Sequence, residues 1–147
     1  MNAQLSEGKC EACNIDATSL SEDEIKSLQP QIPSWSIIED EDKIKRLICA
    51  FAFKDYEESL RFTNNVAKLA EEEDHHPEII LEWGRVTVSW WSHKIKGLHQ
   101  NDFICAAKTD ELFNDFLSHI NKLDCKILNI DTNEKSLEEI FLDVVGL

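Results

Sequence analysis

A hairpin signal in the middle of the chain limits the possible folds more than any other feature. Residues 71–102 read EEEDHHPEIILEWGRVTVSWWSHKIKGLHQND and contain two apolar runs, 79–83 and 86–91, separated by Gly84-Arg85. A two-residue connection whose first residue is glycine is typical of a type II′ turn. Side chains alternate along each strand, so the apolar residues of both runs fall on one face of the predicted hairpin. We therefore expect an antiparallel hairpin in a half-buried sheet.

The same hairpin brings distant histidines together at its open end. The turn predicts that Trp83 pairs with Val86, and this register places His76 opposite His93, with His75 one residue away. Directly opposed residues in a sheet have Cβ atoms ~5 Å apart. The three histidines are therefore predicted to form a cluster.

Composition limits the class of protein. A chain of 147 residues can build one domain with a real core, and its net charge of −14 opposes contact with nucleic-acid phosphates. The sequence contains no apolar run of membrane-spanning length and no signal-peptide core, so no membrane partner is expected. Five scattered cysteines do not suggest a disulfide framework and favour a reducing cytoplasm.

The segments around the hairpin alternate between helix and strand patterns. Ser21 and Glu24 form a capping-box pattern that predicts a short helix ending before Pro30. Residues 35–38 and 43–53 are predicted strands, with an acidic turn between them. Asp55 is a suitable N-cap for a helix whose predicted apolar stripe comprises Tyr56, Leu60, Thr63, Ala67 and Ala70.

A last helix is predicted to begin at about His99 or Gln100, with an apolar stripe through Phe103, Ala106 and Ala107. Short connections imply antiparallel pairing. The expected fold is α+β: a four-stranded antiparallel sheet with three helices packed on one face, plus a C-terminal extension.

The two ends of the chain are expected to differ from this domain. Residues 1–20 are predicted to be a flexible segment, and residues 21–117 form the domain. Within the extension, 118–147, residues 125–130 are a predicted short strand and Ser136 opens a predicted helix. Cys10 and Cys13 have the spacing of a zinc half-site, although no second pair follows nearby.

A group of residues in this order and spacing resembles the pterin-4a-carbinolamine dehydratase family. The group comprises Glu71, His75, His76, Pro77, Trp83, His93, Gly97, Leu98 and Asp102. The resemblance covers roughly residues 21–112, and CEAC, QIPSW and the stretch from EWGRVTVSWW onward are similar to the bacterial branch associated with phenylalanine hydroxylase. The family fold is a four-stranded antiparallel sheet with helices on one side, which agrees with the order predicted from the residues.

The resemblance implies removal of water from a pterin carbinolamine by histidine acid/base catalysis. Histidine suits such a step because its ordinary pKa of ~6.5 makes both protonation states available. It implies His75, His76 and His93 as catalytic residues, with His75 and His93 moving protons and His76 orienting the pterin. Glu71, Pro77 and Asp102 are the implied substrate-binding or positioning residues. Trp91 shares its strand face with His93 and is expected to line the pocket as a further substrate-binding residue. No metal and no cofactor are expected, because the pterin is the substrate.

Structural roles remain alternatives for some of these residues. Asp102 falls in the first turn of a predicted helix, where it could act only as a cap. Glu71 could belong to a solvated helix end, and Trp90 is expected in the core. His99 and His119 are expected to be surface or capping residues.

Two other functions stay open. One is a zinc protein that uses Cys10, Cys13 and the histidines. The other is a protein-binding regulatory module, a partner of phenylalanine hydroxylase or a transcriptional cofactor, as members of the family are. Family members also form homodimers or homotetramers, so we expect a homo-oligomer.

Overall fold

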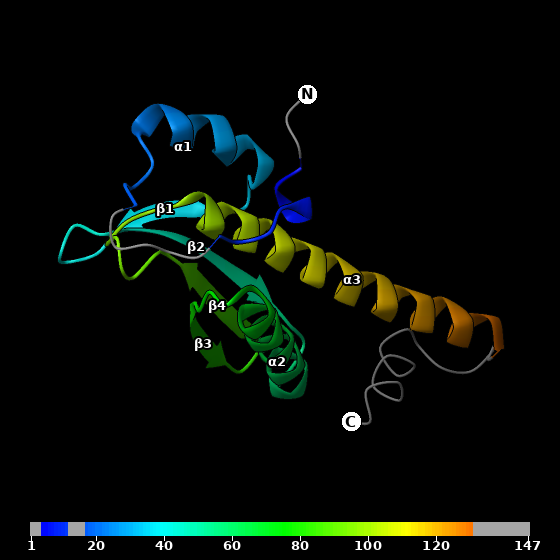
Figure 1. Cartoon of the computed structure of the whole chain (residues 1–147). Coiled ribbons are helices and arrows are strands. Elements are labelled where there is room, and N and C mark those ends of the chain that lie inside the picture. The colour runs from blue at the N-terminus through cyan, green and yellow to red at the C-terminus, as the bar shows by residue number, and fades with distance from the viewer. Residues whose placement is uncertain (1–3, 12–16, 131–147) are drawn as a thin grey trace. The chain divides into compact units, whose positions relative to one another are not determined.

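The computed structural model describes residues 4–11 and 17–130. Figure 1 shows its elements, which in chain order are η1 (Leu5–Glu7), α1 (Glu22–Leu28), η2 (Gln29–Gln31), β1 (Ser36–Glu39), β2 (Lys45–Ala52), α2 (Tyr56–Glu73), β3 (Glu78–Glu82), β4 (Arg85–Trp90) and α3 (Gln100–Ile130). The chain divides into two compact units, Met1–Leu112 and Phe113–Leu147, and α3 contributes to both. In the described part of the chain, no helix has the length and apolarity needed to span a bilayer.

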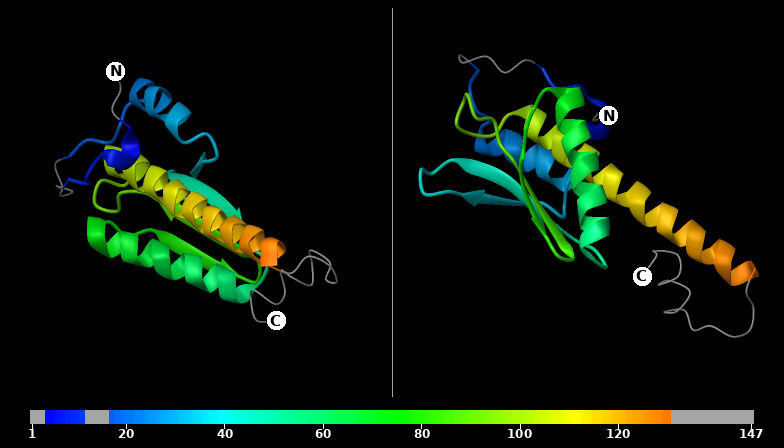
Figure 2. Two further views of the ribbon diagram at one scale, coloured as in Figure 1. Left: turned by 90° about the vertical axis from the view of Figure 1, so that its right-hand side faces the viewer. Right: turned by 90° about the horizontal axis from the view of Figure 1, so that it is seen from below.

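The predicted fold class is confirmed. Within the described residues the four strands form one antiparallel sheet in the order β1-β2-β4-β3. Figure 2 shows α2 and the start of α3 side by side over one face of this sheet. The covered face carries the core side chains, each 4% exposed or less: Leu47, Phe51, Val86, Val88 and Trp90. The other face leaves Ala50, Ala52 and Ile80 exposed.

The start of α1 and both ends of α2 are defined by capping residues. The two helix starts follow the sequence signals closely. Ser21 accepts a hydrogen bond from the Glu24 amide while the Glu24 carboxylate accepts one from the Ser21 amide, which is the predicted capping box. The Asp55 carboxylate accepts from the Glu58 amide at 2.8 Å and starts α2. At the other end of α2, Asp74 takes a left-handed conformation with φ 49°.

The buried stripe of α2 is not the predicted one. Tyr56 is 47% exposed and Leu60 is 41% exposed, whereas Phe62, Val66 and Leu69 are buried. Both sets recur at helical spacing, so periodicity alone could not choose between them. The Phe62 ring packs against Phe51 of β2, with ring centroids 4.9 Å apart, and this contact selects the buried face.

The hairpin forms, but its register differs from the predicted one by two residues. Glu82 pairs with Arg85, so the turn residues are Trp83 and Gly84 rather than Gly84 and Arg85. Gly84 has φ 75° and Trp83 does not have a positive φ, which is the pattern of a type II turn. A shift of two residues keeps the paired strand residues on their predicted faces, so the apolar pattern could not detect the difference. The predicted place of Trp83 on the buried face is wrong, because Trp83 lies in the turn and is 72% exposed.

The two ends of the described part of the chain also differ from prediction. Residues 4–11 pack against the domain: Leu5 is 5% exposed, and its amide donates to the Gln31 side chain at 3.1 Å. Residues 125–130, predicted to be a strand, continue α3 as helix. The helix predicted from Ser136 lies outside the described residues.

Candidate functional site

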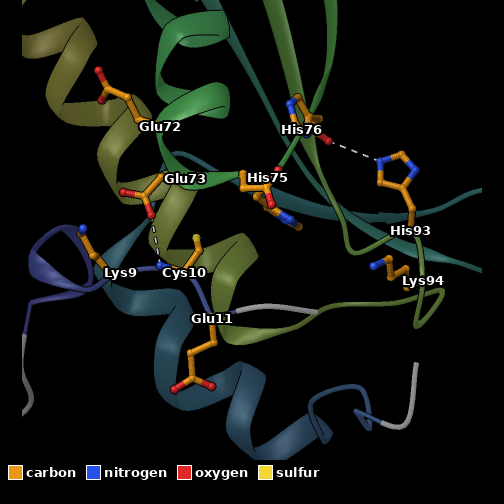
Figure 3. A pocket seen from close by; sticks show the side chains of 10 residues that line it. Lys9, Cys10, Glu11, Glu72, Glu73, His75, His76, His93 and Lys94 are labelled. Atoms are coloured by element: carbon orange, nitrogen blue, oxygen red, sulfur yellow. Dashed lines mark hydrogen bonds between the residues drawn. The ribbon is translucent and has the colours of Figure 1, made fainter. Parts of the chain in front are cut away.

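Two connections near the same end of the sheet carry the three clustered histidines. His75, His76 and Pro77 link α2 to β3, and His93 follows β4 at the start of a turn closed by the bridge between Ser92 and Gly97. Figure 3 shows His76 and His93 facing each other, with His75 deeper between them and α2. The histidines therefore converge as predicted, but the predicted pairing of His76 with His93 is wrong, because the observed register would bring His76 opposite Trp91.

His75 is held from three sides. Its ring is 7% exposed and stacks on Trp90, with centroids 5.6 Å apart and planes at 10°. Its Nε2 lies 2.6 Å from Oδ1 of Asp102, and its backbone amide donates to the Ala70 carbonyl. The ring therefore has a fixed plane and a fixed orientation.

Asp102 contacts both a histidine of the cluster and the start of α3. Its Oδ1 contacts His75, while its Oδ2 accepts from the Ser92 hydroxyl and from the His99 amide, each at 2.8 Å. Since α3 begins at Gln100, His99 is its N-cap residue. The bond from the His99 amide to the Asp102 carboxylate is one of the two hydrogen bonds of a capping box. The His99 ring adds a second cap by accepting from the Asn101 amide at 3.1 Å. Asp102 is completely buried, so the start of α3 determines where His75 is anchored.

His76 and His93 are the exposed members of the cluster. His76 Nε2 lies 2.6 Å from Oε1 of Glu71, which belongs to the last turn of α2. His93 Nε2 lies 3.3 Å from the backbone carbonyl oxygen of His76. This second contact joins the two connections directly.

These contacts assign the ring nitrogens. A carbonyl oxygen and an ionised carboxylate only accept hydrogen bonds, so Nε2 carries the proton in all three rings. None of the described residues hydrogen-bonds the Nδ1 atom of His75, His76 or His93. Fixing one imidazole nitrogen sets the tautomer and leaves the other nitrogen to exchange a proton. The cluster can therefore accept and return protons at Nδ1.

A pocket of about 570 Å³ opens beside these rings. It is lined by Lys9, Cys10, Glu11, Glu72, Glu73, Asp74, His75, His76, His93 and Lys94 (Figure 3). Of the sequence-predicted residues, all three histidines line it, whereas Glu71, Pro77, Trp91 and Asp102 do not. Glu71 and Asp102 contact the histidines instead, so their observed contacts are those of positioning residues.

One wall of the pocket comes from the N-terminal segment, which the sequence did not predict. The Cys10 amide donates to Glu73 at 3.0 Å, and the backbone of Glu11 exchanges two hydrogen bonds with the Asn101 side chain. Burial opposes ionisation of Glu73, but hydrogen bonds from Lys108 and the Cys10 amide prevail and lower the pKa of its carboxyl group. No short-range pattern could have revealed these contacts, since their partners lie more than 60 residues apart.

Cys10 contacts another cysteine rather than the histidines. Its Sγ lies 3.4 Å from Sγ of Cys105 on α3, and both thiols are free. The contact with Cys10 and burial both raise the pKa of Cys105 far above its ordinary range. Cys13 lies outside the described residues, within which no group of three His, Cys, Asp or Glu side chains is arranged to hold a metal.

Trp91 lies behind His93. The two rings are 4.3 Å apart, and the guanidinium of Arg46 covers the indole ring at 3.7 Å from its centroid. Trp91 is 8% exposed. The prediction that Trp91 and His93 share a face is thus confirmed.

Comparison with known proteins assigns the family. The family described as "Pterin 4 alpha carbinolamine dehydratase" matches residues 18–112. A Nitrosococcus oceani protein is 59% identical over 108 residues, which cover 74% of this chain and 95% of that protein. A Vibrio vulnificus protein is 52% identical over 108 residues, with 74% and 97% coverage. Both carry the name "Putative pterin-4-alpha-carbinolamine dehydratase".

A solved structure supports the same assignment. The transcriptional coactivator/pterin dehydratase from Brucella melitensis superposes with a TM-score of 0.58 at 26% identity, covering 65% of this chain and 98% of that chain. The chain belongs to the pterin-4a-carbinolamine dehydratase family, as the sequence resemblance implied.

Proposed function

We propose that this protein is a 4a-hydroxytetrahydrobiopterin dehydratase. The reaction removes the hydroxyl from the bridgehead carbon of a pterin carbinolamine as water and gives the quinonoid dihydropterin. One proton must reach the leaving hydroxyl, and another must leave the neighbouring ring nitrogen. The observation that carries the proposal is the meeting of three imidazoles, each fixed at Nε2, at one pocket in a member of this family.

The histidines differ in surroundings, and this supports different roles. His75 and His93 exchange the two protons, because both line the pocket from opposite connections. His76 binds and orients the pterin, with Glu71 holding its ring. Asp102 keeps His75 in one tautomer, as a carboxylate does for the histidine of a hydrolase triad. The chemistry needs no metal and no cofactor.

The product suggests the cellular setting. Aromatic amino-acid hydroxylases produce the carbinolamine, and reductases consume the quinonoid product, so the protein would recycle tetrahydropterin after phenylalanine hydroxylation. The free thiols of Cys10, Cys49 and Cys105 fit a reducing cytoplasm.

The direct test is dehydration of synthetic carbinolamine by purified variants. General acid–base groups contribute about 10²–10⁴-fold, so we expect His75→Ala and His93→Ala each to lower turnover strongly. His76→Ala should raise KM more than it lowers kcat. The double variant His75→Ala/His93→Ala should lose less than the product of the single effects if both act in one proton-transfer step.

His119→Ala is the matched control, because His119 is an exposed histidine of α3 that does not line the pocket. It should keep wild-type kinetics. Circular dichroism of every sample establishes that the fold persists. A folded double variant with full activity would falsify the assignment of these residues.

A second candidate function is a protein-binding module. The Brucella melitensis relative is described as a transcriptional coactivator as well as a pterin dehydratase. Such a role would concern phenylalanine hydroxylase or a transcription factor. The double histidine variant separates the two functions, because it should lose dehydration but keep binding to a purified partner.

A further inference from the structure

The pocket is backed by a stack of three planar groups that the proposed roles leave unexplained. Trp91 contacts both of the other groups: the Arg46 guanidinium lies over the indole at 3.7 Å from its centroid, and the His93 ring lies 4.3 Å away, tilted by 36°. Arg46 belongs to β2, whereas Trp91 directly follows β4. Because Leu47 pairs with Trp90, the next step of the β2–β4 register brings Arg46 opposite Trp91. The sheet itself therefore sets the stack.

The far end of the stack is fixed to the turn between β1 and β2. Arg46 donates to Oδ2 of Asp40 from both Nε and Nη2, at 3.1 and 2.8 Å. Oδ1 of Asp40 accepts from the amides of Asp42 and Ile44, each at 2.9 Å. The bond from Ile44 is the largest cause of a lowered pKa of the Asp40 carboxyl group, which keeps it ionised. The guanidinium is thus held in one plane.

His93 needs such support more than His75 does. His75 is buried and bonded to a buried carboxylate, whereas His93 is exposed, lies in a turn and has one long hydrogen bond, 3.3 Å, to the His76 carbonyl. One weak bond does not fix the plane of an exposed imidazole. Contact with a buried aromatic ring does, and the guanidinium over that ring holds the ring itself in place by cation–π attraction.

From this arrangement we infer that Trp91 and Arg46 are positioning residues for His93. Trp91 fixes the plane of the imidazole, and Arg46 fixes Trp91. The expected effect on kcat rests on the proposed dehydratase function. The expected effect on the orientation of the His93 ring rests on geometry alone. It also replaces the expected substrate-binding role of Trp91, which does not line the pocket.

The test combines kinetics with NMR of the histidine ring protons. Trp91→Leu keeps an apolar cover over the sheet but removes the planar ring. We expect it to lower kcat on the order of 10- to 100-fold with little change in KM, because misplacing a reacting group costs rate. The nuclear Overhauser contact between the His93 ring and the His76 segment should weaken. Trp91→Phe keeps a planar ring, so its kcat and its His93 contact should stay close to those of the wild-type protein.

Arg46→Met tests the outer layer without emptying the core, since the Arg46 side chain is 21% exposed. In Arg46→Met the NMR signals of the His93 ring should shift. The kcat of this variant should also fall, but by less than that of Trp91→Leu. Arg85→Met is the matched control: Arg85 is an arginine on the same sheet face, paired with Glu82 and away from the stack. It should leave both measurements unchanged.

Three outcomes would overturn the inference: an unchanged kcat in folded Trp91→Leu, a raised KM with unchanged kcat, or a lowered kcat with the His93 contacts intact. If the wild-type protein lacks dehydratase activity, the proposed function fails while the NMR comparison still decides the positioning. If Trp91→Leu does not fold, kcat and the His93 NMR contacts are compared between Arg46→Met and Trp91→Phe instead.

Discussion

At the scale of single residues, Asp102 links the start of a helix to the chemistry of the site. It is fully buried and has three donors around it, from His75, Ser92 and His99. A capping residue can be replaced at modest cost, typically ~1 kcal/mol. A buried carboxylate with three partners cannot, because its removal leaves buried donors unsatisfied.

We predict different outcomes for two substitutions of Asp102. Asp102→Ala should lower the free energy of unfolding by on the order of 3 kcal/mol. Asp102→Asn keeps the shape and one acceptor, so it should cost less stability yet lower kcat strongly by disturbing the His75 tautomer. Urea unfolding and carbinolamine turnover measure the two effects. Equal stability and equal turnover of both variants would contradict this account.

Buried thiols give a prediction about pH. Burial, with a smaller effect of the Asp110 charge, raises the pKa of the Cys49 thiol to about 11. The thiolate is the reactive form, so alkylation of Cys49 in the folded protein should be slow at pH 8 and should rise about tenfold per pH unit towards pH 11. Peptide mapping by mass spectrometry measures this rate.

The same shift links Cys49 to stability. The pKa of the Cys49 thiol in the folded protein is raised above the ordinary 9.0. Its contribution to the free energy of unfolding is therefore present below pH 9 and is lost as the pH rises towards 11.

The control for the alkylation experiment is the protein unfolded in urea. A folded protein labelled at Cys49 as fast as the unfolded chain at pH 8 would refute the assignment.

At the scale of elements, the hairpin turn controls how β3 and β4 align. Gly84 has φ 75°, a Cβ added there would lie 3.2 Å from the Phe53 carbonyl, and the Phe53 amide donates to the Gly84 carbonyl at 2.8 Å. The cross-strand ion pair between Glu82 and Arg85, 2.8 Å, flanks the turn. The turn is therefore defined by the residue that follows β2 as well as by its own sequence.

We expect Gly84→Val to destabilise the protein by roughly 1–3 kcal/mol, because a β-branched residue resists a positive φ. Gly84→Asn is the matched control, since asparagine tolerates the left-handed region better. It should cost clearly less. Thermal unfolding followed by circular dichroism compares the variants, and equal losses for Val and Asn would show that backbone conformation is not the cause.

At the scale of the whole molecule, the sheet has open edges. Within the described residues β1 and β3 are the outer strands, and an unpaired edge tends to find a partner. We predict a homodimer or homotetramer joined through sheet edges. Analytical ultracentrifugation at micromolar concentration tests this, and a purely monomeric protein would contradict it. Deleting residues 132–147 shows whether the C-terminal segment takes part.

Local signals in the sequence determined much of this protein. Capping patterns at Ser21 and Asp55 fixed two helix starts, and alternation fixed which face of each hairpin strand is buried. The hairpin pattern also predicted that the three histidines converge, although it did not predict the contact that anchors His75 to α3. These features depend on residues close in sequence, or on a period of two that survives a register shift.

Tertiary structure decided the rest. It chose the hairpin register, the buried stripe of α2 and the helical state of residues 125–130. It also brought residues 9–11 to the pocket and placed Arg46 behind Trp91. Each of these depends on contacts between elements far apart in the chain, where several local patterns fit equally well and packing selects one of them.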